Sequence, residues 1–514
     1  MIETEICVIG AGPAGSTISS KLAESGRGVI VLDSHQIPRA HVGESLSPAI
    51  IPLLDYLGVR DAVENSKFLR PTRSIVIWGN VNKEAVPQFD TPGFQVDRGV
   101  FDSILVEMAR QKGAVIMSAT RATRITRNDE GGWDVFLRAN GCLETLRCDY
   151  VVDASGRSGV LPHRQRINLS VPTMAIYGYW QEPPILGTEI HIEAGSDRWY
   201  WGTSLPNGKF NATVFVNPRR LQESANGLTR LYRKLLSESA LLRSCLRSEL
   251  ITEPKVCVAT PSIAKEIVGA HWIKCGEAAF AIDPLSSQGV QLAISNALQA
   301  AAVVSTSTTC NAAGAVAARQ FYRNRVRSSA IRNADLAQEI YREHSEFCLD
   351  EFWSARAQFQ HRDIAPIRER HNDIFIFEGE EDELAEGNLE VRHVTYKSHS
   401  SRLDGQVQSE DILELSKAVY IGQSPAINGR RVTLSTAVIL PGGTEPIAFI
   451  GNVPVGYILE LLHFRPTAHN LLRKLQDCFG RGHGLQVFNW IVGSSLVELN
   501  VNPGKDVVER EAVN

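Results

Sequence analysis

Residues 4–33 read TEICVIGAGPAGSTISSKLAESGRGVIVLD, a strand, a glycine-rich turn, a helix and a second strand in order. Residues 6–9 form an apolar run of the length of a buried parallel strand, and helical composition begins at Ala14. Gly10, Gly12 and Gly15 give the spacing G-x-G-x-x-G between them. The first glycine permits a tight turn, the second lets the backbone approach a pyrophosphate, and the third lets the helix pack on the strand.

A carboxylate follows the second strand expected in this stretch. Asp33 comes directly after the apolar run 29–32 and lies 18 residues after Gly15. An acid at the tip of that strand suits the hydroxyls of a ribose. All these features occur in order, so the stretch predicts a Rossmann-type dinucleotide site rather than a glycine turn without a ligand. It leaves open which dinucleotide binds.

Length and composition predict a large globular protein. The chain has 514 residues, 43% of them hydrophobic, which is enough for two or three domains of about 150 residues. Its 53 basic and 57 acidic residues give a net charge of -4, without a basic block that carries aromatic residues. We therefore expect no nucleic-acid partner.

The cysteines and the apolar runs indicate a cytoplasmic protein. Nine cysteines are an odd number, and they form neither a CxxC pair nor the spacing of a zinc site. We expect reduced thiols and no metal. The first residues enter a strand without a basic leader, and no run of about 18 apolar residues occurs, so we expect neither a signal peptide nor a membrane span.

Two later segments also place small residues where a strand meets a helix. Gly43-Glu44-Ser45 precedes a segment with helical spacing of apolar residues. Residues 276–291, GEAAFAIDPLSSQGVQ, follow a short apolar strand and lead into a helix of small residues. Between them, residues 170–218 alternate with period two and predict an antiparallel sheet, followed by helices to residue 250 that help to wall a pocket.

Separate motifs resemble one family. GxGPAG at residues 10–15, the pair Asp97-Arg98, and GEAAFAIDPLSSQGVQLAI at residues 276–294 together resemble the flavoprotein monooxygenases of the para-hydroxybenzoate hydroxylase type. Gly43-Glu44-Ser45 resembles a motif of one branch of this family, the branch that contains the flavin-dependent halogenases. The resemblance covers residues 3–360 and implies FAD as the cofactor and dioxygen as a co-substrate.

The resemblance implies an α/β fold, α+β overall, with a discontinuous Rossmann-like FAD-binding domain at residues 1–165 and 260–330. Residues 70–97 are expected partly in a substrate-binding sheet domain that otherwise spans residues 166–259. A helical region at residues 331–365 and a winged-helix-like small domain at residues 366–514 complete the expected organisation.

The resemblance also implies which residues bind FAD. They are Gly10, Gly12, Ala14, Gly15, Asp33, Gly43, Glu44, Ser45, Arg98, Gly276, Glu277, Pro284, Ser287, Gln288 and Gly289. The glycine turn would hold the pyrophosphate, Asp33 the ribose and Arg98 the middle of the cofactor. The segments 43–45 and 284–289 would lie at the flavin ring. Glu277 stands where the family usually has aspartate, so a carboxylate is retained but its reach to the ribityl chain is longer.

Hydroxylation and halogenation require different pockets. Residues 199–206, WYWGTSLP, resemble the halogenase signature W-x-W-x-I-P but are one residue too long and lack the isoleucine. Halogenases also place a lysine beside the pocket in a segment that ends in Trp-Gly. The matching residues 70–79 contain no lysine, and Lys83 lies beyond them. The sequence therefore favours oxygen insertion, with halogenation as the alternative.

A narrower resemblance is to flavoproteins that add oxygen to a tryptophan of a protein substrate while tryptophan-derived quinone cofactors mature. The C-terminal segment is similar to small winged-helix domains that hold precursor peptides, which bind by strand addition. The alternative is that this module only covers the flavin domain or forms a dimer. DNA binding is not expected, because no basic recognition helix is present.

The chemistry that the resemblance implies is hydroxylation of an electron-rich aromatic ring through a flavin C4a-hydroperoxide. NAD(P)H or a partner reductase would supply electrons. Glu44 and His41 are the candidate bases, and Trp199 and Trp201 are the candidate pocket residues. Besides halogenation, a double-bond reductase of isoprenoid type and a non-catalytic flavin-binding chaperone of a partner protein stay open as alternatives.

Overall fold

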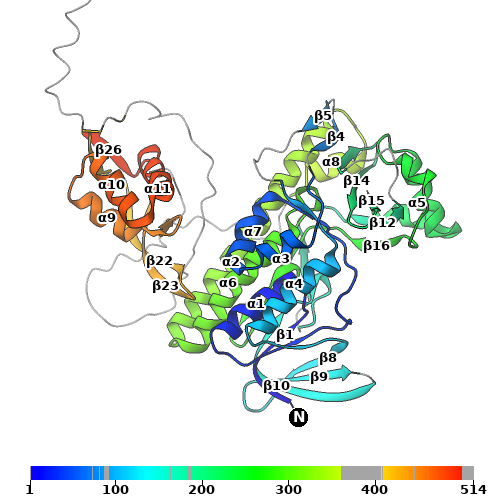
Figure 1. The fold of residues 1–514 in the computed structure, drawn as a ribbon, viewed down its shortest axis with the longest axis horizontal. Helices are drawn as coiled ribbons and strands as arrows, with labels where there is room; N and C mark the ends of the chain where they lie inside the picture. The colour runs from blue at the N-terminus through cyan, green and yellow to red at the C-terminus, as the bar shows by residue number, and fades with distance from the viewer. Residues whose placement is uncertain are drawn as a thin grey trace, which may run out of the picture. The chain divides into compact units, whose positions relative to one another are not determined.

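The computed structural model describes residues 2–71, 73–79, 81–85, 92–139, 141–161, 164–181, 188–360, 407, 409–441, 443 and 446–500 (Figure 1). The chain divides into two compact units. The first comprises Met1–Ser305 and Val326–Ala365, and the second comprises Thr306–Arg325 and Pro366–Asn514. The domain boundary expected between residues 365 and 366 lies outside the described residues.

The first unit is built on a mostly parallel sheet in the order β18-β19-β10-β1-β2-β7. Its strands are β1 (Ile2–Ile9), β2 (Val29–Leu32), β7 (Val115–Met117), β10 (Cys142–Asp153), β18 (Val268–Gly269) and β19 (Trp272–Lys274). β1 is central, parallel to β10 on one side and to β2 on the other. Its residues 6–9 are buried, as a strand covered on both faces requires.

Helices and a hairpin surround this sheet. α1 (Pro13–Glu24) packs beside α4 (Arg98–Gln111), as Figure 1 shows. A hairpin of β8 (Thr120–Arg127) and β9 (Trp133–Ala139) extends from β10. The short helices α2 (Ile51–Leu57) and α3 (Arg60–Asn65) and the paired strands β3 (Ser45–Leu46) and β6 (Phe94–Gln95) complete this part.

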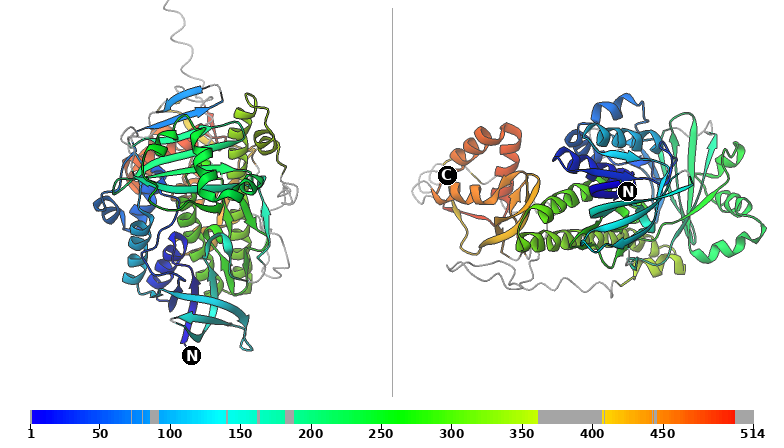
Figure 2. Two further views of the ribbon diagram at one scale, coloured as in Figure 1. Left: turned by 90° about the vertical axis from the view of Figure 1, so that its right-hand side faces the viewer. Right: turned by 90° about the horizontal axis from the view of Figure 1, so that it is seen from below.

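A second sheet in the same unit has the strand order β16-β12-β15-β14-β13-β4-β5. Its strands are β4 (Ser74–Trp78), β5 (Val81–Ala85), β12 (Met174–Gln181), β13 (Ile190–Ala194), β14 (Arg198–Leu205), β15 (Lys209–Val216) and β16 (Lys255–Val258). On one face, Trp180 and Tyr200 pack against Tyr232 and its neighbours on α5 (Leu228–Ser237), seen beside the sheet in Figures 1 and 2. Residues of the other face line the cavity described below.

Aromatic residues close one end of this second sheet. Trp199 is 1% exposed and stacks on Phe215 with ring centroids 3.7 Å apart. The same cluster includes Tyr341 on α7 (Ala312–Ser345) and Trp353 on α8 (Glu351–Ala357). This packing joins the sheet to α7 and α8.

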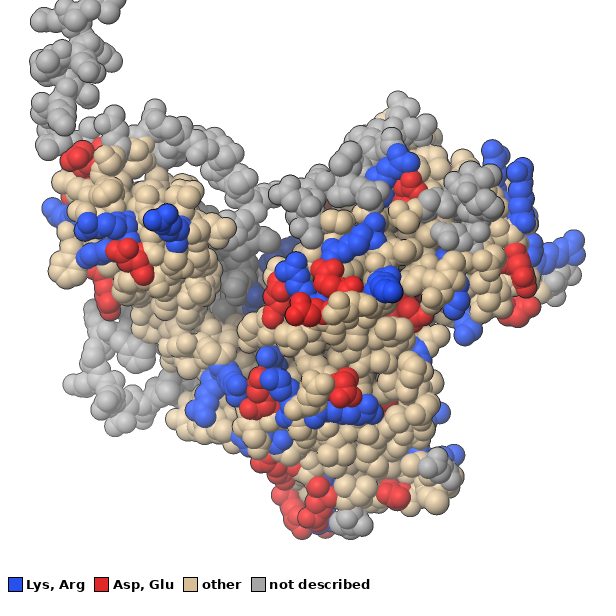
Figure 3. All heavy atoms as spheres, in the orientation of Figure 1, with Lys and Arg blue, Asp and Glu red and all other residues tan. Residues whose placement is uncertain are grey.

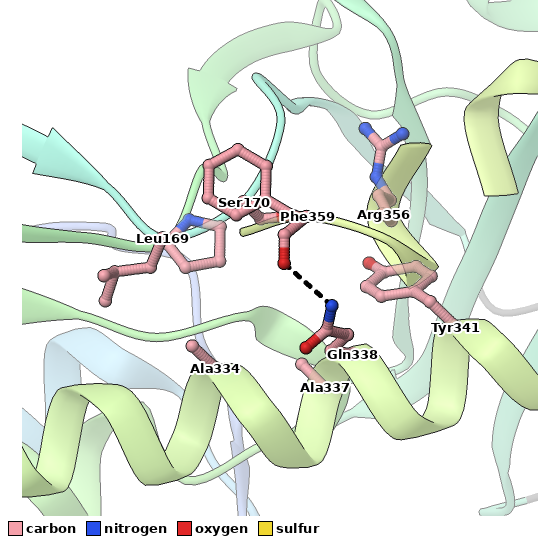
Figure 4. Close-up of a pocket in the computed structure, with 9 residues that line it drawn as sticks. Leu169, Ser170, Ala334, Ala337, Gln338, Tyr341, Arg356 and Phe359 are labelled. Atoms are coloured by element: carbon pink, nitrogen blue, oxygen red, sulfur yellow. Dashed lines mark hydrogen bonds between the residues drawn. The ribbon is translucent and has the colours of Figure 1, made fainter. Parts of the chain in front are cut away.

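The amide side chain of Gln338 on α7 forms hydrogen bonds with the backbone at the end of α8. Gln338 Nε2 donates to the carbonyl oxygen of Ala357 at 3.0 Å. It also donates to the carbonyl oxygen of Phe359 at 2.9 Å, the bond drawn in Figure 4. The void left beside these residues has a volume of about 10 Å³, which is no larger than one water molecule needs. This junction is therefore a packed core rather than a ligand site.

The second unit combines helices with short strands. Its helices are α9 (Val455–His463), α10 (Ala468–Phe479) and α11 (Arg481–Gly493). Its strands are β21 (Ile412–Leu415), β22 (Tyr420–Asn428), β23 (Arg431–Ile439), β24 (Phe449–Ile450), β25 (Val453–Pro454) and β26 (Val497–Asn500). β21 pairs with β26, and β22 with β23. Leu413, Ile458 and Leu471 are among the residues of its core.

Residues 306–325 belong to this unit and comprise the end of α6 (Gly289–Thr309) and the start of α7. Thr306 Oγ1 accepts a hydrogen bond from the N–H of Val432 at 2.9 Å. The predicted fold class, a mixed α/β protein with a Rossmann-like domain, is confirmed. Among the described helices, none is both long and apolar enough to cross a bilayer.

We expect Trp199→Ala to lower the free energy of unfolding by about 3 to 5 kcal/mol, because it opens a cavity in a packed aromatic core. Chemical denaturation measures the change. Trp201→Ala is the matched control: Trp201 is only half-buried and lies two residues along the same strand, so a much smaller loss is expected. Equal losses in the two variants would contradict the assignment of Trp199 to the core.

Candidate active site

One large cavity runs through the first unit. Its volume is about 1360 Å³, above the range of about 300 to 1000 Å³ typical of a site for one small molecule. Its wall includes the glycine turn after β1, the 43–45 loop, the inner face of the second sheet and the start of α6. The cavity therefore has room for a dinucleotide and a second molecule.

The glycine turn leaves no space for side chains at two positions. Gly10 has a φ of +103°, and a Cβ there would lie 2.4 Å from the carbonyl oxygen of Ala154. A Cβ on Gly15 would lie 1.8 Å from the carbonyl oxygen of Gly10. These contacts hold β1, α1 and β10 close together, as the fingerprint predicts.

Gly12 serves the cavity itself. A Cβ on Gly12 would meet only Arg39 Nη2, at 3.5 Å, and would otherwise stand in the cavity. No described side chain caps the N-terminus of α1, so its first N–H groups are available to an anion. The turn therefore offers a pyrophosphate uncapped backbone N–H groups and a position without a side chain.

Asp33 is held at the end of β2 with its carboxylate on the cavity wall. Its Oδ2 accepts from the N–H of Ala11 and its Oδ1 from the N–H of His35, each at 2.9 Å. A carboxylate has about four acceptor positions, so two hydrogen bonds leave capacity for ribose hydroxyls. The glycine turn and Asp33 are thus compatible with the adenosine half of FAD.

Arg98 fastens the 43–45 loop to α4. Asp97 caps the helix by accepting from the N–H of Gly99 at 2.8 Å, which places Arg98 in the first turn. The Arg98 guanidinium forms a buried ion pair with Asp102, at 2.9 Å from Nε to Oδ1. Its Nη1 also donates to the carbonyl oxygen of Val42 at 2.7 Å. The loop is therefore positioned by a buried, charged side chain that also lines the cavity.

Glu44 lies between the 43–45 loop and the second sheet. Its side chain is buried, and Oε1 accepts from Tyr179 Oη at 2.6 Å and from Asn211 Nδ2 at 3.2 Å. Oε2 accepts from the N–H of Gly43 at 2.8 Å. Burial raises the pKa of the Glu44 carboxyl, while the hydrogen bonds from Tyr179 and Asn211 oppose that rise.

Tyr179 and Asn211 are functional candidates that the sequence analysis missed. They lie opposite each other on β12 and β15. Thr213 continues the network, because its Oγ1 donates to Asn211 Oδ1 at 2.9 Å. The period-two alternation of these strands is the signal that could have placed them on the cavity face, but only with the strand register known.

His41, the other candidate base, also lines the cavity. Its Nδ1 lies 2.7 Å from the carbonyl oxygen of Val42, which requires a proton on that nitrogen. Burial lowers the pKa of the His41 imidazole, and the nearby Arg98 lowers it further. The Nδ1 atom of His41 is therefore already engaged as a hydrogen-bond donor.

The inner face of the second sheet presents aromatic and other uncharged side chains to the cavity. From this sheet and the residue after it, the lining residues are Ala175, Tyr177, Trp201, Asn211, Thr213, Phe215, Cys257, Val258 and Ala259. Trp201 lies on the cavity wall, whereas Trp199 lies in the aromatic core described above.

The segment at the start of α6 completes the wall. Pro284, Ser287, Gln288 and Gly289 line the cavity, and Ser287 has a φ of +51°. Asp283 anchors this turn: its Oδ1 accepts from the N–H of Leu285 and its Oδ2 from Tyr341 Oη, each at 3.1 Å. Burial raises the pKa of the Asp283 carboxyl.

The neighbouring residues Glu277 and Gly276 differ in position. Glu277 lines the cavity and pairs with Arg157 at 3.1 Å. A Cβ on Gly276 would lie 2.7 Å from Ala14 Cβ, so this glycine permits close packing on α1. Gly15 and Gly276 therefore shape the site from behind its wall.

Most residues predicted to bind FAD line this cavity. They are Gly10, Gly12, Ala14, Asp33, Gly43, Glu44, Ser45, Arg98, Glu277, Pro284, Ser287, Gln288 and Gly289. Within the described residues, no group of three or more His, Cys, Asp or Glu side chains is arranged to hold a metal ion.

Comparison with known proteins identifies the class. Residues 3–212 match a family model described as FAD binding domain. The chain is 28% identical over 392 residues to tryptophan 2-halogenase of Chondromyces crocatus, covering 72% of this chain and 74% of that protein. The chain thus carries an FAD-binding domain, is similar to flavin-dependent halogenases and is an FAD-dependent oxidoreductase, which confirms the predicted cofactor and enzyme class.

Two solved structures share the fold over nearly the whole chain. The flavin-dependent halogenase CmlS has a TM-score of 0.71 at 20% identity, covering 98% of each chain. QhpG, a peptidyl tryptophan dihydroxylase essential for tryptophylquinone cofactor biogenesis, has a TM-score of 0.66 at 22% identity. That match covers 96% of this chain and 99% of QhpG.

We expect Gly12→Val to weaken FAD binding at least about tenfold, because its side chain would occupy space that the pyrophosphate needs. Titration of flavin fluorescence measures the affinity. Gly28→Ala is the control in the same domain, since a Cβ there would meet atoms only at 3.6 Å or more. Unchanged FAD affinity in Gly12→Val would show that the cofactor does not approach this turn.

Proposed function

We propose that this protein is an FAD-dependent monooxygenase that inserts oxygen into an electron-rich aromatic ring. The observation that carries the proposal is the composition of the cavity wall. It concerns the part of the wall that the second sheet contributes, beside the 43–45 loop. An uncharged sheet face that includes aromatic side chains stands beside the buried carboxylate of Glu44. FAD, once reduced by NAD(P)H or a partner reductase, supplies activated dioxygen there.

The residues of the sheet face orient the substrate and exclude water. Trp201, Tyr177 and Phe215 offer flat apolar surfaces on which an aromatic ring stacks. Excluding water protects a reactive oxygen species from hydrolysis and strengthens polar interactions in the cavity.

Glu44 is the base that we propose. A carboxylate whose pKa is raised by burial works closer to neutral pH than an exposed one. It would accept the proton that the ring loses when oxygen is added. His41 is the less suitable candidate, because its Nδ1 is already bonded to Val42.

Halogenation is the second candidate function, favoured by the likeness to tryptophan 2-halogenase and to CmlS. The resemblance to halogenases implies a lysine beside the pocket, where it works with hypohalous acid. No lysine is found among the described residues that line the cavity. Lys83 lies in β5, whose side chains are outside the described residues. These observations favour oxygen insertion.

We further propose that the ring is the tryptophan side chain of a peptide or protein. A free amino acid carries an ammonium and a carboxylate, which in a cavity need charged partners. The side chains that the second sheet presents to the cavity are uncharged. A tryptophan within a chain has no such charges, and the peptidyl tryptophan dihydroxylase QhpG shares the fold.

We expect a tryptophan-containing peptide to gain the mass of one or two oxygen atoms when incubated with the reduced enzyme, dioxygen and a halide salt. Mass spectrometry of the intact peptide measures this, and free tryptophan is the matched control, expected to stay unmodified. A mass gain corresponding to a halogen would establish halogenation instead. Binding of the peptide without a mass change would contradict the assignment as a monooxygenase.

We expect Glu44→Gln to abolish product formation while FAD stays bound. In Tyr179→Phe, the carboxylate loses a hydrogen bond that favours its charged form, so the pKa of Glu44 should rise further. Because the base acts when deprotonated, the increase of rate with pH should move to higher pH. Rate–pH profiles of the chemical step measure this.

Tyr177→Phe controls for loss of a cavity hydroxyl, since Tyr177 lies two residues away on the same strand and is not bonded to Glu44. In Tyr177→Phe, the increase of rate with pH should occur at the same pH as in the wild type. If the increase of rate with pH is not shifted in Tyr179→Phe, the ionisation that controls the rate is not that of Glu44.

A further inference from the structure

The carboxylates on the cavity wall have partners close by. Asp33 lies 3.6 Å from Arg39, and Glu277 lies 3.1 Å from Arg157. Glu44 and Asp283 accept hydrogen bonds from tyrosine hydroxyls. Asp33 and Glu277 thus lie against arginines, and Glu44 and Asp283 are held by hydrogen bonds.

Further arginines line the same cavity but do not pair with a described carboxylate. Arg121, Arg138 and Arg164 are exposed, and no described carboxylate forms an ion pair with them. Arg164 donates only a long hydrogen bond to the carbonyl oxygen of Val160, at 3.5 Å. On the face shown in Figure 3, basic and acidic side chains are interspersed.

The hairpin places two of these arginines directly opposite each other. Arg121 on β8 pairs with Arg138 on β9. Like charges at directly opposite positions destabilise an antiparallel pair. Stability of the hairpin therefore gives no reason for this arrangement, whereas an anionic ligand does.

The arginines lie at the adenosine end of the cavity. The N–H of Thr120, the first residue of β8, donates to the carbonyl oxygen of Asp33 at 2.8 Å. Arg121 is the next residue, so it lies near the acid that suits the ribose. A pyrophosphate at Gly12 and the N-terminus of α1 is already provided with backbone N–H groups.

We propose that Arg121, Arg138 and Arg164 form a capture surface for the anionic FAD molecule, which we call the arginine rim. The rim draws the cofactor toward the cavity and accelerates association, whereas the glycine turn holds it once bound. The protein has a net charge of -4 and would otherwise repel a dinucleotide. Clusters of one charge at a cleft raise association rates by about 10- to 1000-fold.

The test mixes flavin-freed protein with FAD in a stopped-flow instrument and follows flavin fluorescence. The double variant Arg121→Gln with Arg138→Gln should associate about tenfold more slowly at low ionic strength. The difference should shrink as salt is added, because salt screens exposed charges. The dissociation rate should stay within about twofold of the wild type, since steering acts mainly on association.

Two control variants separate steering from other effects. Arg121→Lys with Arg138→Lys keeps the charge but not the guanidinium geometry, so fast association should persist. Arg124→Gln removes an exposed charge from β8 that lies outside the cavity wall and over Phe136, so the association rate should be nearly unchanged.

Three results would overturn the proposal. An association rate unchanged in the double glutamine variant would show that the rim does not steer FAD. A faster dissociation with unchanged association would show that the arginines contact the bound cofactor instead. An equal slowing in Arg124→Gln would mean that only the net charge of the protein matters.

Discussion

The backbone of Gly10 passes so close to the carbonyl oxygen of Ala154 that no side chain fits between them. This contact brings the turn after β1 against the end of β10, the neighbouring parallel strand. Gly15 and Gly276 extend the same close packing to α1 and the start of the 276–289 segment. Parts of the chain that lie far apart in sequence thereby meet around one cavity, which is where a dinucleotide has to be held.

The second constraint is the buried carboxylate of Glu44. An unpaired charge in the interior is costly, and hydrogen bonds to both of its oxygens offset that cost. Two of these bonds come from strands of the second sheet and one from the 43–45 loop. The same interactions therefore join the sheet to the 43–45 loop and place an ionisable group beside the cavity face of the sheet. In this site, structural integrity and acid–base chemistry depend on the same atoms.

Several features could be predicted from the sequence because they depend on local geometry. The strand, turn and helix around Gly10, the acid at Asp33 and the capped start of α4 at Asp97 each follow from neighbouring residues. The hydrogen bonds of Tyr179 and Asn211 to Glu44 could not be predicted in this way. Each depends on the pairing of β12 with β15 and on a loop more than a hundred residues away. Trp199 and Trp201 show the same limit, since only packing against α7 and α8 distinguishes core from wall.

The sequence by itself determined the mixed α/β class and the glycine positions that suit FAD, because backbone conformation and close packing act over short stretches of chain. Only the tertiary structure decided which charged groups are paired, which are buried and which face the cavity. Burial, hydrogen bonding and charge compensation arise between segments distant in sequence, and no spacing within one segment encodes them. The burial of Glu44 beside the uncharged face of the second sheet and the arginine rim without carboxylate partners are both consequences of that assembly.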